Sequence, residues 1–121
     1  MEIRDLQGIA TKQGVIWNLS FDEWQHVAVI ECIEGQERSH HYHRDRGHWL
    51  YVAHGAMDYD ESRLDGSHPH HARLVRGQMV YTAPGLVHRC GKFDKVTTLV
   101  SLSMHNSQEA YSADTVKQDF R

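Results

Sequence analysis

The sequence predicts a small all-β protein, a barrel or a sandwich of short strands. Short runs rich in β-branched and aromatic residues alternate with glycine- and proline-containing turns. No segment has the sustained periodicity of a long helix. A chain of 121 residues can bury one core but is too short for two ordinary domains. We therefore expect a single domain over residues 1–121.

The individual elements follow from apolar content and from the glycines that end each run. An N-terminal arm over residues 2–14 is expected to hold one short strand. The expected strands are 14–20, 26–34, 39–43, 48–54, 56–60, 70–76, 79–82 and 96–104. The polar stretch 61–67 is predicted to be an exposed hairpin loop. For the tail 106–121, a short helix over 112–120 and a frayed end are both open.

Composition excludes several classes of function. The net charge is −3 with neutral histidine, and no run of Lys or Arg offers a surface for nucleic acid. No apolar run reaches membrane-spanning length, and the N-terminus lacks the apolar region of a signal peptide, so a cytoplasmic protein is expected. Cys32 and Cys90 lie far apart without a CxxC pair, which favours free thiols over a zinc knuckle or a disulfide.

Histidine is the unusual component, at 11 of 121 residues. His41 and His43 are two apart, so on an extended chain they project to the same face. The intervening turn lets His48 approach from a second strand, and His88 is a fourth candidate far downstream. Neutral imidazole is the commonest protein ligand for several transition metals. The spacing therefore predicts a metal-binding cluster.

The first histidine segment resembles the first motif of the cupin superfamily. That motif places a glycine five residues before a His-x-His pair, which a glutamate and a second glycine follow. Over residues 35–55 the matching positions are Gly35, His41, His43 and Gly55. His48 stands where the glutamate is usual, which would make the site entirely histidine.

A second segment, residues 77–92, resembles the other cupin motif. The matching positions are Gly77, Pro84, Gly85 and His88. Ala83 stands where the first proline is usual, and Lys92 stands where an asparagine sometimes follows. Spaced matches over two motifs are a far more specific signal than a lone His-x-His pair.

The resemblance implies a small cupin β-barrel, a double-stranded β-helix of the jelly-roll type. It further implies one divalent transition metal held by His41, His43, His48 and His88, with iron, manganese, nickel, copper and zinc all open. The partners implied are a small-molecule substrate and a second copy of the chain in a homodimer; neither nucleic acid nor membrane is expected.

The favoured function is a metal-dependent enzyme that acts on a small organic substrate chelated at this mononuclear site, with a dioxygenase-like oxidoreductase activity. One alternative is a non-catalytic cupin that binds a ligand or a sugar. Another is a metal-dependent isomerase, cyclase or lyase. The segment 43–49 also resembles the C-terminal cupin of bifunctional phosphomannose isomerases, a resemblance that belongs with the alternative of a ligand- or sugar-binding module.

Four further features have two interpretations each. His54 is six residues beyond His48 and would share its strand face, as a catalytic base or as a packed histidine. Cys90 could face the cavity, although a buried thiol is normally inert. Glu31 is a buried carboxylate or, as we favour, lies on the solvent face of an edge strand. The run 68–71 is expected to be a solvated loop instead of a second metal site.

Overall fold

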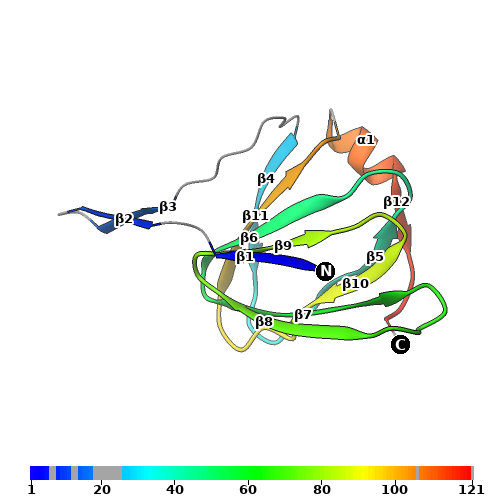
Figure 1. Cartoon of the computed structure of the whole chain (residues 1–121), viewed down its shortest axis with the longest axis horizontal. Helices are drawn as coiled ribbons and strands as arrows, with labels where there is room; N and C mark the ends of the chain where they lie inside the picture. Colours follow the sequence, from blue (N-terminus) through cyan, green and yellow to red (C-terminus); the bar gives the residue numbers. More distant parts are fainter. Residues whose placement is uncertain (6–7, 12–13, 18–25, 106, 121) are drawn as a thin grey trace.

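The computed structural model describes residues 1–5, 8–11, 14–17, 26–105 and 107–120. Within these residues, two five-stranded antiparallel sheets face each other, and a two-stranded hairpin extends away from them (Figure 1). The elements are β1 Glu2–Asp5, β2 Gly8–Thr11, β3 Gly14–Trp17, β4 His26–Cys32, β5 Arg38–His43, β6 His48–His54, β7 Ala56–Arg63, β8 His70–Val75, β9 Gln78–Thr82, β10 Leu86–Cys90, β11 Thr97–Ser103, α1 Gln108–Ala113 and β12 Thr115–Lys117.

The strand order identifies the architecture as a jelly roll. One sheet runs β1-β9-β6-β11-β4 and the other runs β12-β5-β10-β7-β8. From β4 onward, each strand therefore lies in the other sheet from the strand before it, except for β7 and β8, which pair with each other. This confirms the predicted all-β cupin barrel, in which side chains from the inner faces of both sheets fill the interior.

Two strands differ from the sequence-based prediction. The structure extends β7 through residues predicted to be an exposed loop, and Glu61 and Ser62 are buried there because β7 pairs with β10 on one side and β8 on the other. Glu61 lies 3.0 Å from the Met1 amino nitrogen. The strand β10 was not predicted, because only five residues separate the Pro84-Gly85 turn from Gly91.

The C-terminal tail is more ordered than either predicted alternative. The helix α1 ends before most of the predicted 112–120 segment, and β12 then pairs with β5. The Ser107 hydroxyl accepts a hydrogen bond from the Ala110 N–H and caps the helix start. A six-residue helix is too short to give a periodic signal, so its place depends on this cap and on tertiary packing.

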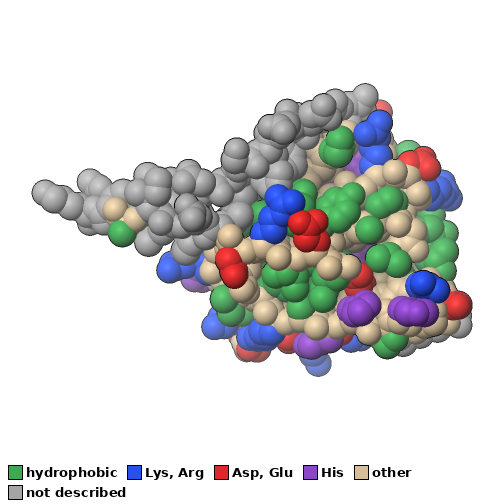
Figure 2. Space-filling view, viewed as in Figure 1, with side chains coloured by type: hydrophobic (Ala, Val, Ile, Leu, Met, Phe, Trp, Pro, Cys, Tyr) green, Lys and Arg blue, Asp and Glu red, His purple; other side chains and the backbone are tan. Residues whose placement is uncertain are grey.

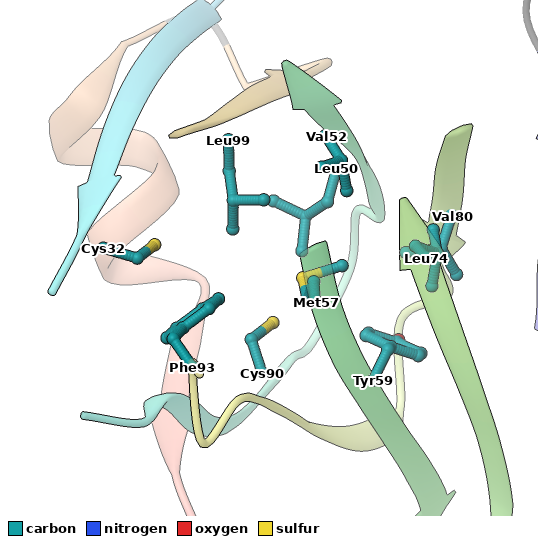
Figure 3. Packing of buried hydrophobic residues seen from close by; sticks show 10 residues of the cluster. All are labelled: Cys32, Leu50, Val52, Met57, Tyr59, Leu74, Val80, Cys90, Phe93 and Leu99. Atoms are coloured by element: carbon teal, nitrogen blue, oxygen red, sulfur yellow. The ribbon is translucent and has the colours of Figure 1, made fainter. Parts of the chain in front are cut away.

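An apolar cluster fills one end of the barrel, and Figure 3 shows its side chains converging from both sheets. Its buried members are Cys32, Leu50, Val52, Met57, Tyr59, Leu74, Val80, Cys90, Phe93 and Leu99. Both cysteines are free thiols, as predicted. Burial raises the pKa of Cys90 to about 12, so this thiol stays protonated and unreactive near neutral pH.

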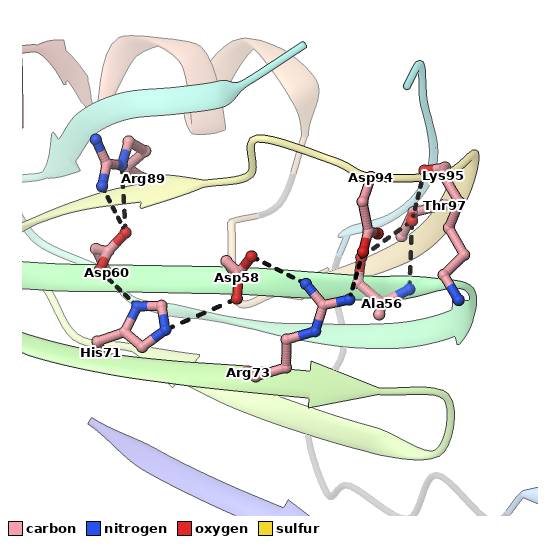
Figure 4. Close-up of polar contacts among 9 residues, drawn as sticks. All are labelled: Ala56, Asp58, Asp60, His71, Arg73, Arg89, Asp94, Lys95 and Thr97. Carbon is pink, nitrogen blue, oxygen red and sulfur yellow. Dashed lines mark hydrogen bonds and ion pairs between the residues drawn. The ribbon is translucent and has the colours of Figure 1, made fainter. Parts of the chain in front are cut away.

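Ion pairs cover the outer face of β7 and β8 (Figure 4). Asp60 accepts hydrogen bonds from Arg89 and lies 2.8 Å from the His71 ring, while Arg73 donates to Asp58 and Asp94. The run 68–71 is exposed and belongs to this surface, as predicted. Figure 2 shows positive and negative side chains interspersed over the visible face.

The edge strand β4 has a polar contact and apolar side chains on its outer face. Glu31 is exposed there and accepts a hydrogen bond from the Thr98 hydroxyl at 3.0 Å, which confirms the interpretation favoured from the sequence. Val27 and Val29 are exposed on the same strand. The homodimer predicted from the sequence stays a prediction. No helix in the described part of the chain is long and apolar enough to cross a bilayer.

Two glycines with nearly the same backbone conformation offer a test of packing at the β6–β7 turn. Gly55 and Gly85 have φ of 86° and 80°. A Cβ on Gly55 would lie 2.8 Å from the Val96 carbonyl oxygen and closer still to the Thr97 hydroxyl, whereas a Cβ on Gly85 would meet nothing within 4 Å. Thr97 cannot move easily, since its hydroxyl bonds to the backbone N–H and C=O of Ala56.

We therefore predict that Gly55→Ala lowers the free energy of unfolding more than Gly85→Ala does. Both variants incur the left-handed penalty of ~1–2 kcal/mol. Gly55→Ala adds an overpacking cost of ~1–3 kcal/mol. Urea unfolding of the two variants measures the difference, and equal losses would contradict the packing at this turn.

Candidate functional site

Four histidine rings meet inside the barrel. His41 and His43 come from β5, His48 from β6 and His88 from β10, so the two sheets both contribute. Ring centroids lie 4.9 Å apart for His41 and His43, 4.5 Å for His41 and His88, and 4.7 Å for His43 and His48. The tertiary structure therefore gathers all four histidines that the sequence proposed; we call them the histidine cluster.

Three of these rings are close enough to share one cation. One nitrogen from each of His41, His43 and His88 lies within 4.8 Å of the other two. His48 lies beside this trio, with its ring 4.7 Å from that of His43 and 5.7 Å from that of His88. The trio together with His48 forms a concave set of donors, as a mononuclear site requires.

The nitrogens that face the cluster have no hydrogen-bond partner. The Nε2 atoms of His41, His43 and His48 and both ring nitrogens of His88 are buried and unpartnered in the described structure. Buried polar atoms are nearly always satisfied in native proteins, and leaving one unsatisfied costs about 1–3 kcal/mol. A neutral imidazole has one nitrogen with a free lone pair, so the four rings can offer four lone pairs at one place, which marks a site for a ligand that accepts them.

The far side of His43 is held by a hydroxyl that fixes the ring tautomer. Thr115 donates its hydroxyl proton to the Tyr111 carbonyl at 2.7 Å. Its oxygen can therefore only accept from the His43 Nδ1–H, 3.2 Å away. The Nε2 of His43 then carries a free lone pair toward the cluster. His48 has an equivalent contact, since its Nδ1 lies 3.2 Å from the Ser101 hydroxyl oxygen.

Burial keeps the four rings uncharged. Desolvation, with a smaller contribution from neighbouring histidines, lowers the pKa of His41 and of His43 to about 4. The same causes lower the pKa of His48 and His88 well below the ordinary value. A neutral ring is the form that binds a metal. At neutral pH the cluster therefore presents lone pairs and no protons that would have to leave.

His54 does not belong to this site, and the prediction that it shares the face of His48 is wrong. Thr98 pairs with His54 and Leu99 pairs with Val52, so Ala53 is an extra residue in β6. Such a β-bulge shifts the alternation of inward and outward side chains by one position. His54 is consequently exposed, and it cannot act as a base inside the barrel.

A second bulge interrupts β5, the strand that carries His41 and His43. His88 pairs with His41 and Arg89 pairs with Ser39, so His40 is the extra residue. Ser39 and His40 have φ of 75° and 57°, a strained conformation for residues other than glycine. Such strain often accompanies functional sites, because the surrounding contacts must hold it in place. Here it sets which side chains of β5 reach the interior.

The helix α1 closes the barrel over the cluster through Tyr111. Its ring centroid lies 5.0 Å from that of His43 and 5.7 Å from that of His48. Burial raises the pKa of Tyr111 to about 12, so it remains a neutral phenol. Asp114 ends the helix and accepts hydrogen bonds from the Asp45 and Arg46 N–H groups. This carboxylate joins the helix to the turn that carries the chain from His43 to His48.

Among the residues that the structure describes, two cavities can be compared with the position of the cluster. A cavity of about 240 Å³ lies between β4, β5, β11 and α1 and is lined by His41 together with His26, Arg38 and Tyr111. A larger one, of about 330 Å³, is lined by His105, Asp114 and the turn 44–46, with no member of the cluster. We take the smaller cavity as the candidate substrate site because His41 opens into it.

Several residues at the cluster and its cavity have no local signal in the sequence. Thr115 lies in the polar tail, where neither pattern nor spacing marks it. His26 and Ser101 fall on predicted strands, yet only the tertiary structure brings them to the cavity at His41. Arg38 lies between the expected strands 26–34 and 39–43, where no pattern marks it. A motif search finds ligands held by short spacing but not the residues that other strands bring beside them.

Comparisons with known proteins agree on the fold. A scan against protein-family models gives no match, and no curated protein sequence is significantly similar. Among solved structures, the chain is similar to QdtA, a sugar 3,4-ketoisomerase from Thermoanaerobacterium thermosaccharolyticum in complex with TDP. The TM-score is 0.81 at 17% identity, covering 97% of this chain and 87% of that one.

Two further structures support the same fold. A 3,4-ketoisomerase from Helicobacter canadensis has a TM-score of 0.83 at 14% identity and covers 97% of this chain and 90% of that one. A dTDP-4-dehydrorhamnose 3,5-epimerase from Sulfolobus tokodaii has a TM-score of 0.73 at 15% identity, covering 87% and 70%.

These structures contradict the dioxygenase-like oxidoreductase predicted from the sequence, because by name they are isomerases and an epimerase. The reason for the error is chemical. Histidine ligands suit many metals and several reaction classes, so the motif alone does not select oxygen chemistry. At these identities the likeness establishes architecture alone. The chain has the RmlC-like cupin fold, in agreement with the cupin resemblance of its two motifs.

Proposed function

We propose that this chain is a metal-dependent isomerase that moves a proton between the two carbons of an α-hydroxy carbonyl compound. The observation that carries the proposal is the histidine cluster, with five unpartnered buried nitrogens beside a cavity. The names of the structural neighbours support the reaction class, since ketoisomerases and epimerases both act next to a sugar carbonyl group.

The cluster fits a divalent transition metal. His41, His43 and His88 would hold the ion with His48 as a fourth ligand, while Thr115 and Ser101 would orient the rings of His43 and His48 from behind. Neutral ligands leave the ion its full charge, so when bound it would act as a Lewis acid that polarises the substrate's carbonyl group.

His26 is the residue that we assign to proton transfer. It lines the same cavity as His41 from the opposite sheet, and its Nδ1 is buried without a partner in the described structure. Imidazole is the side chain that most often moves protons in enzymes, and one base on one face can take a proton from one carbon and return it to its neighbour. Tyr111 lies beside it, at 6.2 Å between ring centroids, and lines the same cavity.

The first prediction concerns metal binding. Calorimetric titration with Zn²⁺, Ni²⁺ or Mn²⁺ is expected to give one site per chain. His43→Gln and His88→Gln should abolish it, because each removes a donor. Thr115→Val should weaken it by about 10–100-fold, since the His43 ring loses its partner.

His54→Gln is the matched control, because His54 is exposed outside the barrel. It should bind as the wild type does. Equal binding by wild type, His43→Gln and His88→Gln would refute the metal site.

The second prediction concerns acid stability of the metal-free chain. His43 is fully buried, and its pKa falls from 6.5 to about 4 on folding. The unfolded chain therefore binds more protons between these values, and stability is lost as pH falls from about 6.5 toward 4. At about 1.4 kcal/mol per pKa unit, His43 alone corresponds to about 3 kcal/mol.

Urea midpoints at pH 7 and pH 5 measure this loss, at pH values above the ordinary titration range of most carboxylates. His43→Gln should flatten the dependence. A wild-type midpoint that does not change between these pH values would show that the rings are not buried in neutral form.

The third prediction concerns activity. When the metal-loaded protein is incubated with an α-hydroxy ketone in D₂O, the hydrogen on the carbon next to the carbonyl group should exchange for deuterium. Proton NMR measures the rate of this exchange. His26→Gln should lower the exchange rate by about 10²–10⁴-fold without changing metal affinity. TDP-4-keto-6-deoxyglucose, which is bound in one of the neighbouring ketoisomerase structures, is the second substrate to be tested.

Exchange equal in His26→Gln and wild type would overturn the role of His26. Binding of these compounds with no exchange in either protein would overturn the isomerase and leave a ligand-binding barrel.

A further inference from the structure

The bulge in β5 brings a cation to the side of the strand that bears His41. Arg38 is three residues before His41, so a regular strand would place the two on opposite faces. Because His40 is the extra residue, Arg38 instead pairs with Cys90, while His41 pairs with His88. Cys90 and His88 are both buried on the inner face of β10. Arg38 therefore lies on the inner side, at the rim of the barrel.

The cavity agrees with this placement. Arg38 lines the same cavity of about 240 Å³ as His41. Its charge is felt by Cys32, Cys90 and Tyr111, where it opposes the effect of burial on their pKa values. Arg38 thus lies at the wall of this cavity while staying open to solvent.

Arg38 has no ion-pair partner within the described residues, although Arg73 and Arg89 on the outer surface both pair with aspartates. Glu37, the acidic residue directly before Arg38 in the sequence, instead contacts His40 at 2.7 Å. The described lining of the cavity contains hydroxyl, imidazole and guanidinium groups but no carboxylate. Such a lining favours a negatively charged group on the ligand.

We propose that Arg38 binds an anionic group of the substrate, a carboxylate or a phosphate ester, and so orients the carbonyl end of the same molecule toward His41. This deepens the proposed function, on which it rests, by naming the substrate as a small anionic hydroxy-carbonyl compound. The cavity is smaller than the ~300–1,000 Å³ of drug-sized ligand sites, which favours a compact acid over a nucleotide-linked sugar.

Three compounds that share one hydroxy-ketone unit test the proposal. Hydroxypyruvate carries a carboxylate, dihydroxyacetone phosphate carries a phosphate, and dihydroxyacetone is neutral. Calorimetry should show that at least one of the two anions binds about ten-fold or more tightly than the neutral compound, and which one does so separates carboxylate from phosphate. Arg38→Gln should remove that preference. Arg38→Lys should restore part of it, because the charge returns without the planar fork.

Arg76→Gln is the matched control, since Arg76 is an exposed arginine in the β8–β9 turn and its loss changes net charge equally. It should keep the preference. Retention of the preference in Arg38→Gln, equal loss in Arg76→Gln, or no preference in the wild type would each overturn the proposal. So would TDP binding more tightly than both small anions.

Failure of the isomerase is distinguishable from failure of this site. Binding with an anion preference but without deuterium exchange would overturn the reaction and support the role of Arg38. Exchange of all three compounds with equal kcat/KM in wild type and Arg38→Gln would support the reaction and overturn the role of Arg38.

Discussion

The enclosure of four imidazole rings with unsatisfied nitrogens, three of the rings buried and that of His41 half-buried, is the constraint around which the barrel is arranged. Each ring is uncharged because desolvation lowers its pKa, and each is placed by a strand whose other side chains build the core. Unsatisfied buried nitrogens destabilise a fold unless something binds them. The surrounding structure compensates by holding the rings from outside, through the Thr115 and Ser101 hydroxyls, and so leaves the inward lone pairs available.

Two single-residue bulges decide what else reaches the interior. In β6 the extra residue, Ala53, turns His54 outward and removes a base from the site. In β5 the extra residue, His40, turns Arg38 inward and adds a cation. A one-residue bulge therefore removes a side chain from the interior in β6 and adds one in β5, and both strands carry cluster histidines. The polar character of the cavity depends on these bulges as much as on the ligands.

The C-terminal segment covers one side of the histidine cluster and holds the turn beside it. Asp114 binds the turn between β5 and β6 and also lies 2.8 Å from Nε2 of the buried His105. The next residue, Thr115, holds His43, and Tyr111, one helical turn earlier, covers the cluster. Burial opposes ionisation of Asp114, but hydrogen bonds from the His105 ring and from the Arg46 and Asp45 N–H groups outweigh it and lower the pKa of this carboxyl, so it stays ionised at neutral pH. The tail is thus part of the site, although its sequence looks like a polar end.

The sequence by itself determined the fold class, the two motifs and the four cluster histidines, because ligand pairs held by short spacing and strands ended by glycine are local features. It also indicated the exposed Glu31 and the inert Cys90. Only the tertiary structure decided that Glu61 is buried, that His54 is outside, and that Arg38 and His26 share a cavity with His41. The physical reason is that a bulge shifts alternation by one residue and depends on pairing with another strand, which no local pattern encodes. The choice of reaction is likewise non-local, because the cavity wall, and not the ligand motif, selects the substrate.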